Sequence, residues 1–377
     1  MEKPSIGETI RKGARLLLQG RVTLTFDQLE FHQHDIPFLK RLNFLIQGIQ
    51  LMLRSVHRIG IPPILQIEPS NICNLQCLTC ATGAGLVKRP AALMPFDMYQ
   101  RVIDQIRNYV YLLVFWSWGE PFVNKDSFRM IRYAKEKGLL VHTSTNGHFF
   151  NTKEQARKII DSGLDSLIIA VDGLDQTTYE KYRRGGNLQS VINSIENIVA
   201  ERATLGVSHP LITLRFIVMK HNEHQINRVM KFAKDLGVDV ITFRSAVVRR
   251  SEIDLKDRLT PLSPDFQRFT HKGSPSEKRL NNYCHRPYAN LTIFSNGDIV
   301  TCENDYNATE TLGNIAHQNV LKILSSGTSR NFFRGFRKNL DKFIFCKECE
   351  NRDMKGHSAN VQTIILNKKF YHDKKNN

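Results

Sequence analysis

The sequence predicts an α/β fold: a partial (β/α)6 barrel with an N-terminal helical extension and a small C-terminal cysteine-rich α+β module. Three observations predict it. Short apolar runs alternate with amphipathic segments over residues 64–248, glycines follow several of those segments, and the seven cysteines fall into a group of three and a group of four. Such alternation is typical of stacked βα units that build a parallel sheet.

Residues 1–63 form the predicted helical extension. An apolar stripe within it repeats at spacings of four and three, as one face of a helix does: Phe38, Leu42, Leu45, Ile49, Met52 and Val56. Lys and Arg residues flank this stripe. Two interpretations stay open for residues 38–59: a helix that packs on the main domain, or a helix that lies on an anionic membrane surface.

Residues 64–248 form the predicted barrel, which is TIM-like in its repetition of strand and helix. The expected strands are Ile64–Glu68, Tyr111–Trp116, Leu139–Thr143, Ser166–Val171, Ile212–Met219 and Val240–Arg244. The expected helices are Asp97–Tyr109, Ser127–Lys137, Lys153–Ser162, Leu188–Thr204 and Glu223–Leu236. In such barrels the chemistry collects at the carboxyl ends of the strands.

Three further regions complete the chain. Residues 249–280 are rich in charge and proline and indicate a connector. Residues 281–355 form the predicted cysteine-rich module, whose clearest element is a hairpin over Ala289–Cys302 around Asn296-Gly297. Residues 356–377 are expected to form a basic tail.

The composition restricts the class of protein. The 377 residues are 41% hydrophobic and 24% charged, which is ordinary for a globular chain. We find no signal peptide and no apolar stretch of the roughly 20 residues that a membrane span needs, so we expect a cytoplasmic protein, alternatively one peripheral at the membrane. Lys and Arg number 53 against 36 Asp and Glu, and the net charge of +17 favours anionic partners. No nucleic-acid-binding module is clear in the sequence.

The first cysteine group follows the first expected strand at once, as Cys73-x3-Cys77-x2-Cys80. Three thiolates within eight residues suit three irons of a 4Fe–4S cluster and leave the fourth iron open to another ligand. Zinc is the alternative, but a structural zinc site takes four ligands, and no nearby histidine has a matching spacing.

This cysteine pattern after a first strand resembles the radical S-adenosylmethionine (radical SAM) superfamily. Three further segments at strand ends resemble motifs of that family in the same order: Trp118-Gly119-Glu120-Pro121, Thr145-Asn146-Gly147 and Ala170-Val171-Asp172-Gly173. Tyr182-Arg183 resembles the position of a family arginine that reaches the cofactor. The sequence departs from the family at three positions: Trp118 replaces a glycine, Ala170 replaces a serine, and Thr79 stands where a bulky residue is common.

The resemblance implies a specific chemistry and specific residues. A 4Fe–4S cluster on Cys73, Cys77 and Cys80 binds S-adenosylmethionine and cleaves it reductively to a 5′-deoxyadenosyl radical, which abstracts hydrogen from a substrate. The implied cofactor-binding residues are Gly119, Glu120, Pro121, Asn146, Asp172 and Arg183. An external one-electron donor such as flavodoxin or ferredoxin is implied as a partner. Glu120 has a simpler alternative role at the N-terminus of a helix. No catalytic side chain is identified.

The second cysteine group comprises Cys284, Cys302, Cys346 and Cys349. Four thiolates suit either zinc or a second 4Fe–4S cluster. The pattern resembles the SPASM/twitch modules that follow radical SAM domains, which implies an auxiliary 4Fe–4S cluster. The cysteine count is closer to the shorter twitch form. A cluster with four thiolates has no open iron, so electron transfer is its simplest role, and a structural role is the alternative.

The substrate is not identified by the sequence. A sugar-like small molecule, a peptide and a lipid-linked compound stay open, and the basic charge suits an anionic one. Trp116, His142, Arg215 and Arg244 are candidates to line its site or to fill the barrel. Two other classes of protein are kept as alternatives: a non-enzymatic iron–sulfur carrier and a zinc-containing nucleic-acid-binding protein.

Overall fold

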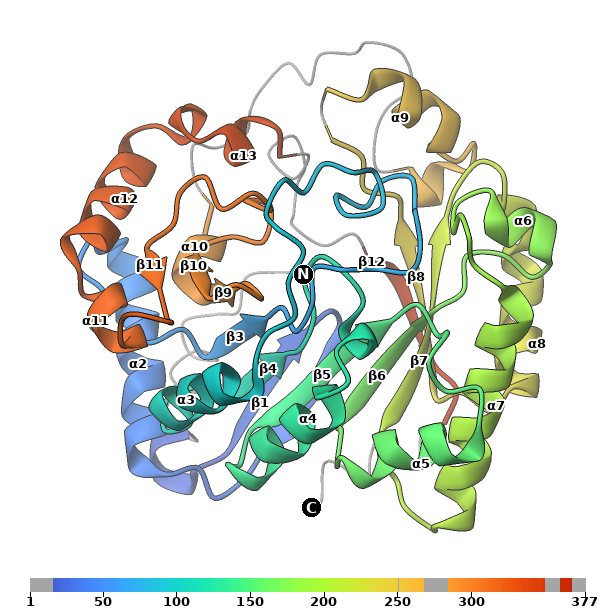
Figure 1. Cartoon of the computed structure of the whole chain (residues 1–377), viewed down its shortest axis with the longest axis horizontal. Coiled ribbons are helices and arrows are strands. Elements are labelled where there is room, and N and C mark those ends of the chain that lie inside the picture. The colour runs from blue at the N-terminus through green and yellow to red at the C-terminus, as the bar shows by residue number, and fades with distance from the viewer. Residues whose placement is uncertain (1–15, 250, 268–283, 350–359, 368–377) are drawn as a thin grey trace.

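The computed structural model describes residues 16–249, 251–267, 284–349 and 360–367. Ten strands of the described chain form one sheet, in the order β11-β10-β9-β3-β4-β5-β6-β7-β8-β12. Its centre is a run of parallel strands in chain order, which confirms the predicted α/β barrel architecture. Figure 1 shows these strands side by side with the helices along their outer side.

The barrel strands lie close to their predicted positions. They are β3 (Ile64–Ile67), β4 (Leu112–Val114), β5 (Leu140–Thr145), β6 (Ser166–Ala170), β7 (Leu211–Val218) and β8 (Val240–Ser245). The helices between them are α3 (Phe96–Ile106), α4 (Ser127–Glu136), α5 (Lys153–Asp161), α6 (Gln176–Glu180), α7 (Leu188–Thr204) and α8 (Ile226–Asp235), with short 3-10 turns η1 (Pro121–Val123) and η2 (Glu223–Gln225).

Alternate residues of the strands serve two cores. One set, for example Leu65, Leu113 and Ile169, packs with the helices in the main core. The other set, for example Leu112 and Val240, packs in a second core with the N-terminal segment. Successive side chains of a strand point to opposite faces, so the sheet is apolar on both.

The N-terminal extension is not only helical, which corrects the prediction. A hairpin of β1 (Val22–Phe26) and β2 (Leu29–Gln33) precedes helix α2 (Phe38–Leu53). Its two-residue turn, Asp27 and Gln28, has positive φ at both positions. This hairpin was missed because such turns are recognised by glycine, and here neither position is glycine. Leu24, Leu29 and Phe31 fill the second core against the barrel strands.

Helix α2 packs on the main domain, as one of the two alternatives expects, but not through the predicted apolar stripe. Four members of that stripe are exposed, Phe38, Leu42, Ile49 and Met52, while Val56 packs partly against the main core. The polar residues of the helix are buried in their place.

The C-terminal module continues the barrel sheet. Strand β9 (Asn290–Ile293) pairs parallel with β3 and antiparallel with β10 (Asp298–Val300), so the predicted hairpin around Gly297 is present. The other elements are α10 (Arg286–Ala289), β11 (Gly313–Asn314), α11 (Val320–Leu324), α12 (Gly327–Lys338), η4 (Leu340–Lys342) and α13 (Ile344–Lys347). Figure 1 shows this module, in orange and red, beside the β3 edge of the barrel.

The expected connector and tail contain regular structure. Residues 249–280 include α9 (Ile253–Leu259) and η3 (Pro264–Phe266), while residues 268–280 lie outside the described residues. The tail prediction for 356–377 is wrong in part, because β12 (Asn360–Ile365) pairs antiparallel with β8. The strand was not predicted because its β-prone run, Val361–Ile365, is flanked by Lys and Asn residues.

No helix among the described residues is long and apolar enough to cross a membrane.

Candidate active site

The first cysteine loop leaves the carboxyl end of β3 and folds back tightly on itself. Cys73, Cys77 and Cys80 all lie on it, and the Cys80 amide donates to the Cys77 carbonyl at 3.3 Å. A side chain at Gly83 would bring its Cβ within 2.5 Å of the Cys77 backbone nitrogen. The tight return at Gly83 therefore brings the loop backbone against Cys77.

The Gly119-Glu120-Pro121 segment packs directly on this loop. Gly119 has φ of +113°, and a Cβ there would lie 2.3 Å from the Ser70 carbonyl oxygen. The Glu120 amide donates to the Ile72 carbonyl at 2.9 Å. Pro121 begins η1 and is buried. The segment thus fixes the backbone next to Cys73.

The Glu120 carboxylate joins two strand ends. It accepts hydrogen bonds from Thr145 Oγ1 and the Asn146 amide, both at 2.8 Å, and from the Phe122 amide at 3.3 Å. The bond to Phe122 caps η1. Glu120 therefore also acts at the N-terminus of a short helical turn, which is the simpler role considered for it. Burial raises the pKa of Glu120 to about 7, although these donors oppose the shift.

Asn146 connects the end of β5 to the cysteine loop. Its Nδ2 donates to Asn74 Oδ1 at 2.7 Å and lies 3.8 Å from Cys73 Sγ. Its Oδ1 accepts from the His148 amide at 3.2 Å. Asn146 is buried, and its bond to Asn74 supports the loop just after Cys73.

Asp172 and Arg183 form a buried ion pair beside Cys77. Arg183 Nε donates to Asp172 Oδ2 at 2.5 Å, and Arg183 Nη1 lies 3.7 Å from Cys77 Sγ. Asp172 Oδ1 also accepts from the Ile217 amide at 2.6 Å. Burial works against the charge on Arg183, yet Asp172 and Cys77 hold its pKa above the usual value. A fixed cation therefore stands next to the Cys77 sulfur.

Two thiols of the first group, Cys73 and Cys77, lie in surroundings that disfavour their ionisation. Burial raises the pKa of Cys73 to about 12 and also raises the pKa of Cys77. Cysteine binds metals as the thiolate, and buried thiolates need a compensating positive charge. Among the described residues, no three His, Cys, Asp or Glu side chains are arranged so that they could hold a metal ion. The donor type fits an iron–sulfur cluster, whose ferric and ferrous ions supply that charge.

Three cysteines of the second group lie near enough to the partly buried Arg286 side chain to act on its charge. Burial opposes that charge, but Glu303, Cys302, Cys284 and Cys349 raise the pKa of Arg286. Cys346 lies in α13, and its carbonyl accepts from the Cys349 amide at 3.3 Å, which closes the C-x2-C turn. Burial also raises the pKa of Cys302 well above its usual value. Cys284, Cys302 and Cys349 thus act on one cation, and Cys346 is joined to Cys349 by the short turn.

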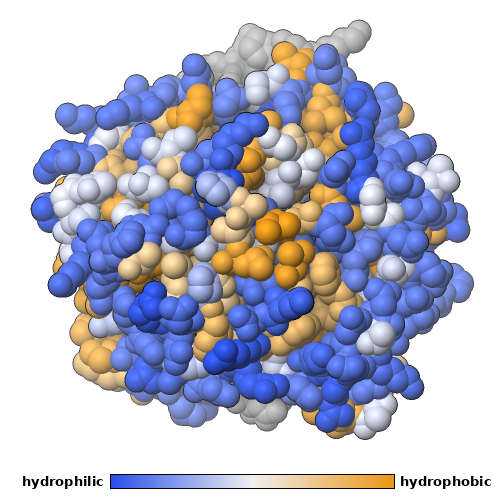
Figure 2. Space-filling model, viewed as in Figure 1, coloured by the Kyte–Doolittle hydropathy of each residue, from blue (hydrophilic) through white to orange (hydrophobic). Residues whose placement is uncertain are grey.

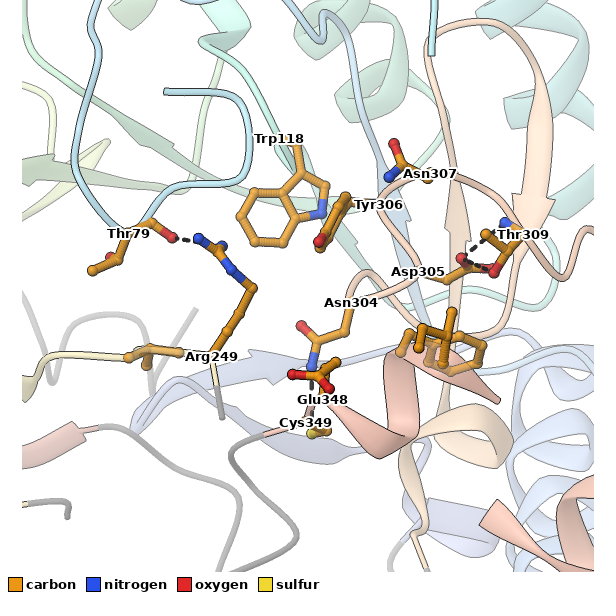
Figure 3. A pocket seen from close by; sticks show the side chains of 13 residues that line it. Thr79, Trp118, Arg249, Asn304, Asp305, Tyr306, Asn307, Thr309, Glu348 and Cys349 are labelled. Carbon is orange, nitrogen blue, oxygen red and sulfur yellow. Dashed lines mark hydrogen bonds between the residues drawn. The ribbon is translucent and has the colours of Figure 1, made fainter. Parts of the chain in front are cut away.

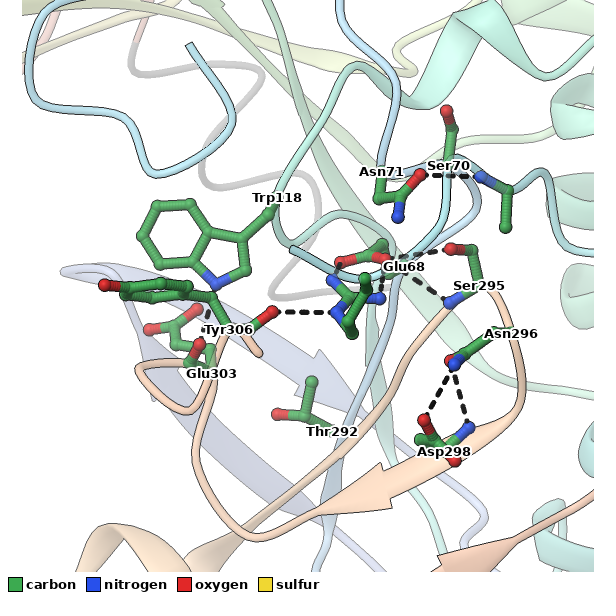
Figure 4. Close-up of polar contacts among 12 residues, drawn as sticks. Glu68, Ser70, Asn71, Trp118, Thr292, Ser295, Asn296, Asp298, Glu303 and Tyr306 are labelled. Carbon is green, nitrogen blue, oxygen red and sulfur yellow. Dashed lines mark hydrogen bonds and ion pairs between the residues drawn. The ribbon is translucent and has the colours of Figure 1, made fainter. Parts of the chain in front are cut away.

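Arg89 ties the first cysteine loop to the C-terminal module through Glu68, which Figure 4 shows facing Ser295 of that module. It makes a two-pronged ion pair with the Glu68 carboxylate at 2.8 and 2.9 Å and donates to the Tyr306 carbonyl at 2.7 Å. Its guanidinium also lies 3.8 Å from the centre of the Phe294 ring. Ser295 Oγ adds a hydrogen bond to Glu68 at 3.0 Å.

Trp118 makes a second connection to that module. Its indole nitrogen donates to the Glu303 carbonyl at 2.6 Å, and its ring meets Tyr306 edge-on with 5.7 Å between ring centres. The sequence singled out Trp118 only as a departure from a motif. Its position before Gly119 places the ring between the two cysteine sites.

A cavity of about 160 Å³ lies between the two cysteine groups. Thr79, beside Cys80, lines one part, and Cys349 lines another. Figure 3 shows Trp118 and Tyr306 facing this space, with Arg249 reaching toward Thr79. Arg249 donates to the Thr79 carbonyl at 3.4 Å and pairs with Glu252.

Sequence reasoning missed Arg249, Asn304 and Tyr306 as lining residues. For Asn304 and Tyr306 a signal existed, because both follow Cys302 within four residues. Arg249 had no such signal, since it sits at the start of the expected connector.

The four barrel residues suggested as lining are elsewhere. His142 is fully buried between Phe26 and Phe31 of the hairpin and Trp116, so it fills the barrel. Arg215 forms an ion pair with Asp27 at the hairpin turn, with Arg244 close enough to act on the same charges. The described lining of the cavity contains none of the four.

Comparison with known proteins identifies two domains in the chain. The profile of the radical SAM superfamily matches residues 67–233, and that of an iron–sulfur cluster-binding domain, SPASM, matches residues 284–350. The AdoMet-dependent heme synthase of Methanosarcina barkeri is 27% identical over 210 residues, which cover 56% of this chain and 57% of that protein.

Two further similarities cover more of the chain. The tungsten-containing aldehyde ferredoxin oxidoreductase cofactor-modifying protein of Pyrococcus furiosus is 23% identical, over 77% of this chain and 87% of that protein. The structure of Streptococcus suis SuiB bound to S-adenosylmethionine superposes with a TM-score of 0.58 and 17% identity, over 85% of this chain and 79% of that one, which supports the fold.

The chain spans less than two thirds of the length of the heme synthase that it matches. The paired domains do not favour a non-enzymatic carrier or a zinc-containing nucleic-acid-binding protein. The ordered strand-end motifs, the two cysteine groups and both profiles agree. The chain therefore belongs to the radical SAM superfamily of enzymes and carries a SPASM-type iron–sulfur cluster-binding domain.

Proposed function

We propose that this protein oxidises a substrate group held in the cavity between its two cysteine sites, by radical SAM chemistry. The observation that carries the proposal is the cavity itself, whose lining includes Thr79 beside the first cysteine group and Cys349 of the second. A group bound there lies next to both sites.

The first site comprises the thiolates of Cys73, Cys77 and Cys80, which hold one 4Fe–4S cluster. The second comprises the thiolates of Cys284, Cys302, Cys346 and Cys349, which hold an auxiliary one. When bound, the first cluster and S-adenosylmethionine supply the 5′-deoxyadenosyl radical that takes a hydrogen atom from the substrate.

Residues around the first site shape the cofactor pocket. Gly119, Glu120 and Pro121 present backbone groups, and Asn146 holds the Cys73 side of the loop by its contact with Asn74. Asp172 orients Arg183, whose guanidinium stands 3.7 Å from Cys77 Sγ and offsets negative charge there. These six residues are the proposed cofactor contacts.

The size of the cavity limits what enters it. Engineered apolar cavities of roughly 150 Å³ hold a benzene-sized molecule. The 160 Å³ cavity therefore accepts one ring-sized group, such as a sugar ring or one side chain of a peptide. A larger peptide or lipid-linked substrate keeps its remainder outside.

The auxiliary site serves as an electron acceptor in this proposal. Cys284, Cys302, Cys346 and Cys349 would hold the auxiliary cluster, which would supply a one-electron acceptor for the substrate beside the cavity wall at Cys349 once a hydrogen atom has been removed. The substrate thereby loses two electrons and two protons, while an external one-electron donor, a flavodoxin or a ferredoxin, supplies the electron that cleaves S-adenosylmethionine.

The test begins with metal content after anaerobic purification and reconstitution. About eight iron ions per chain with matching sulfide and no zinc is the expected result, whereas about four iron ions with one zinc would remove the electron-acceptor role. Reduction with dithionite in the presence of S-adenosylmethionine should then form 5′-deoxyadenosine.

Two single-site variants separate the roles of the sites. Cys77→Ala should abolish 5′-deoxyadenosine formation, and continued cleavage would contradict the assignment of the first site. Cys349→Ala should retain cleavage but lose oxidised product. Full product from that variant would refute the redox role of the auxiliary site.

A further inference from the structure

Helix α2 packs on the protein through its polar side and exposes its apolar side. Four polar residues at helical spacing are its buried members: Lys40, Asn43, Gln47 and Gln50. Its large apolar side chains face outward, with 67% of Phe38, 77% of Met52 and 68% of Leu53 exposed. An ordinary surface helix has the opposite arrangement.

Specific hydrogen bonds fix this orientation. Asn43 Nδ2 donates to the Ile61 carbonyl at 2.8 Å, and its Oδ1 accepts from the Ile61 amide at 2.9 Å. Gln50 Oε1 accepts from the Ile59 amide at 3.0 Å, and Lys40 Nζ donates to the Gly138 carbonyl at 3.3 Å. Rotation of the helix would break these buried bonds, so the apolar face is held outward.

The outward apolar face extends beyond the helix. Leu17 and Leu18 are also exposed, and Leu17 is joined to α2 by the hydrogen bond from Arg41 Nη1 to its carbonyl at 2.8 Å. Ile59, just after the helix, is 81% exposed. We call Leu17, Leu18, Phe38, Leu39, Leu42, Ile49, Met52, Leu53 and Ile59 the outer face. Figure 2 shows apolar colour at the lower left margin, where Figure 1 places α2.

Helix α2 and the residues after it carry basic side chains and no carboxylate, although Asp35 before the helix is exposed. From Ile36 to Ile67 the sequence contains no Asp or Glu, while Arg54 and His57 are exposed beside the face. The whole chain carries a net charge of +17. A second copy of this chain would bring the same basic residues of α2 and its C-terminal flank to the contact, whereas anionic lipid headgroups complement them.

We propose that the outer face of α2 docks the protein on an anionic membrane. The helix lies in the plane of the interface with its apolar side chains below the headgroups and the exposed Arg54 at the level of the lipid phosphates. The buried polar face of α2 keeps the barrel attached on the water side. This proposal is independent of the radical chemistry, because no residue of the outer face lines the cavity or lies in either cysteine group.

The test is sedimentation of the reconstituted full chain with lipid vesicles. We expect binding to phosphatidylcholine vesicles that contain phosphatidylglycerol, and weaker binding to phosphatidylcholine alone. The variant Phe38→Glu/Met52→Glu should lower the bound fraction at least tenfold, because it places two carboxylates on the outer face.

A matched control uses exposed apolar residues elsewhere. Ile253 and Leu262 are 67% and 62% exposed in and after α9, far from α2 in Figure 1. Ile253→Glu/Leu262→Glu should bind vesicles as the unaltered chain does. Iron content and S-adenosylmethionine cleavage should be equal in all three proteins, so that failure of the membrane proposal is distinct from failure of the active-site proposal.

Three results would overturn the proposal. The first is absence of the unaltered chain from sedimented anionic vesicles. The second is a dimer in light scattering that Phe38→Glu/Met52→Glu converts to a monomer, which assigns the outer face to a second copy. The third is binding to vesicles only after residues 2–15 are removed, which would assign the outer face to contact with that segment.

Discussion

At the residue scale, the first cysteine loop depends on a backbone contact that has no room for a side chain. Gly119 combines a positive φ with a contact to the Ser70 carbonyl and to Asn71. Both neighbours are backbone atoms, which cannot move aside as a flexible side chain can. The glycine of this motif is therefore required by the geometry of the loop that carries Cys73.

Gly119→Ala should disrupt the first site selectively. The strained φ alone costs roughly 1–3 kcal/mol, and the clash displaces the loop as well. Iron should fall from about eight to about four ions per chain, since the auxiliary site is separate. Gly138→Ala is the matched control, because Gly138 has a positive φ of +75° with nothing within 4 Å of an added Cβ. Full iron content in Gly119→Ala would refute this view of the loop.

At the element scale, the β1–β2 hairpin closes the inside of the barrel. Its apolar residues fill the second core, and Asp27 at its turn pairs with Arg215 of β7. Burial alone would raise the pKa of Asp27, but Arg215 and Arg244 hold it well below its usual value. Burial lowers the pKa of Arg215 to about 10, so both partners are charged at neutral pH.

Asp27→Asn should destabilise the protein by about 3–5 kcal/mol, because it leaves the buried Arg215 cation without its partner. The change is measured as a lower midpoint of urea unfolding at neutral pH. Because the folded pKa of Asp27 is lowered, the contribution of the pair is present above the ordinary carboxyl pKa of 3.8 and is lost as the pH falls below it.

Asp35→Asn provides the control for that measurement. Asp35 is exposed near the end of the same hairpin, and its positive φ of 51° is one that Asn adopts readily. Its unfolding midpoint should stay close to that of the unaltered chain. Equal midpoints for both variants would show that the hairpin is held by its apolar residues alone.

At the scale of the whole molecule, sequence reasoning succeeded where the signal is local. Cys73, Cys77 and Cys80 lie within eight residues, and the barrel strands each carry their own apolar run, so both were predicted. The ion pair of Asp27 and Arg215 joins residues 188 positions apart, so it cannot be predicted from spacing along the chain. The position of Arg249 at the cavity wall and the outward orientation of the apolar side of α2 were not predicted for the same reason, because both are set by tertiary contacts.

The two domains are joined into one unit at Glu68 and Arg89. Glu68 is fully buried at the end of β3, and its carboxylate is paired by Arg89 and by Ser295 of the C-terminal module. Arg89 also binds the Tyr306 carbonyl, beside the cavity. This junction therefore fixes the distance between the two cysteine sites and the shape of the space between them.

Arg89→Met tests that junction. It removes the cation, leaves the buried Glu68 carboxylate with Ser295 alone, and should cost about 3–5 kcal/mol in the free energy of unfolding. The double variant Glu68→Gln/Arg89→Met removes both charges and should recover part of that loss, since an uncompensated buried charge is the larger penalty. Unfolding followed by urea, with both variants at equal iron content, measures the difference. If the single variant is as stable as the unaltered chain, the pair does not join the domains, and the strand pairing of β3 with β9 carries the junction by itself.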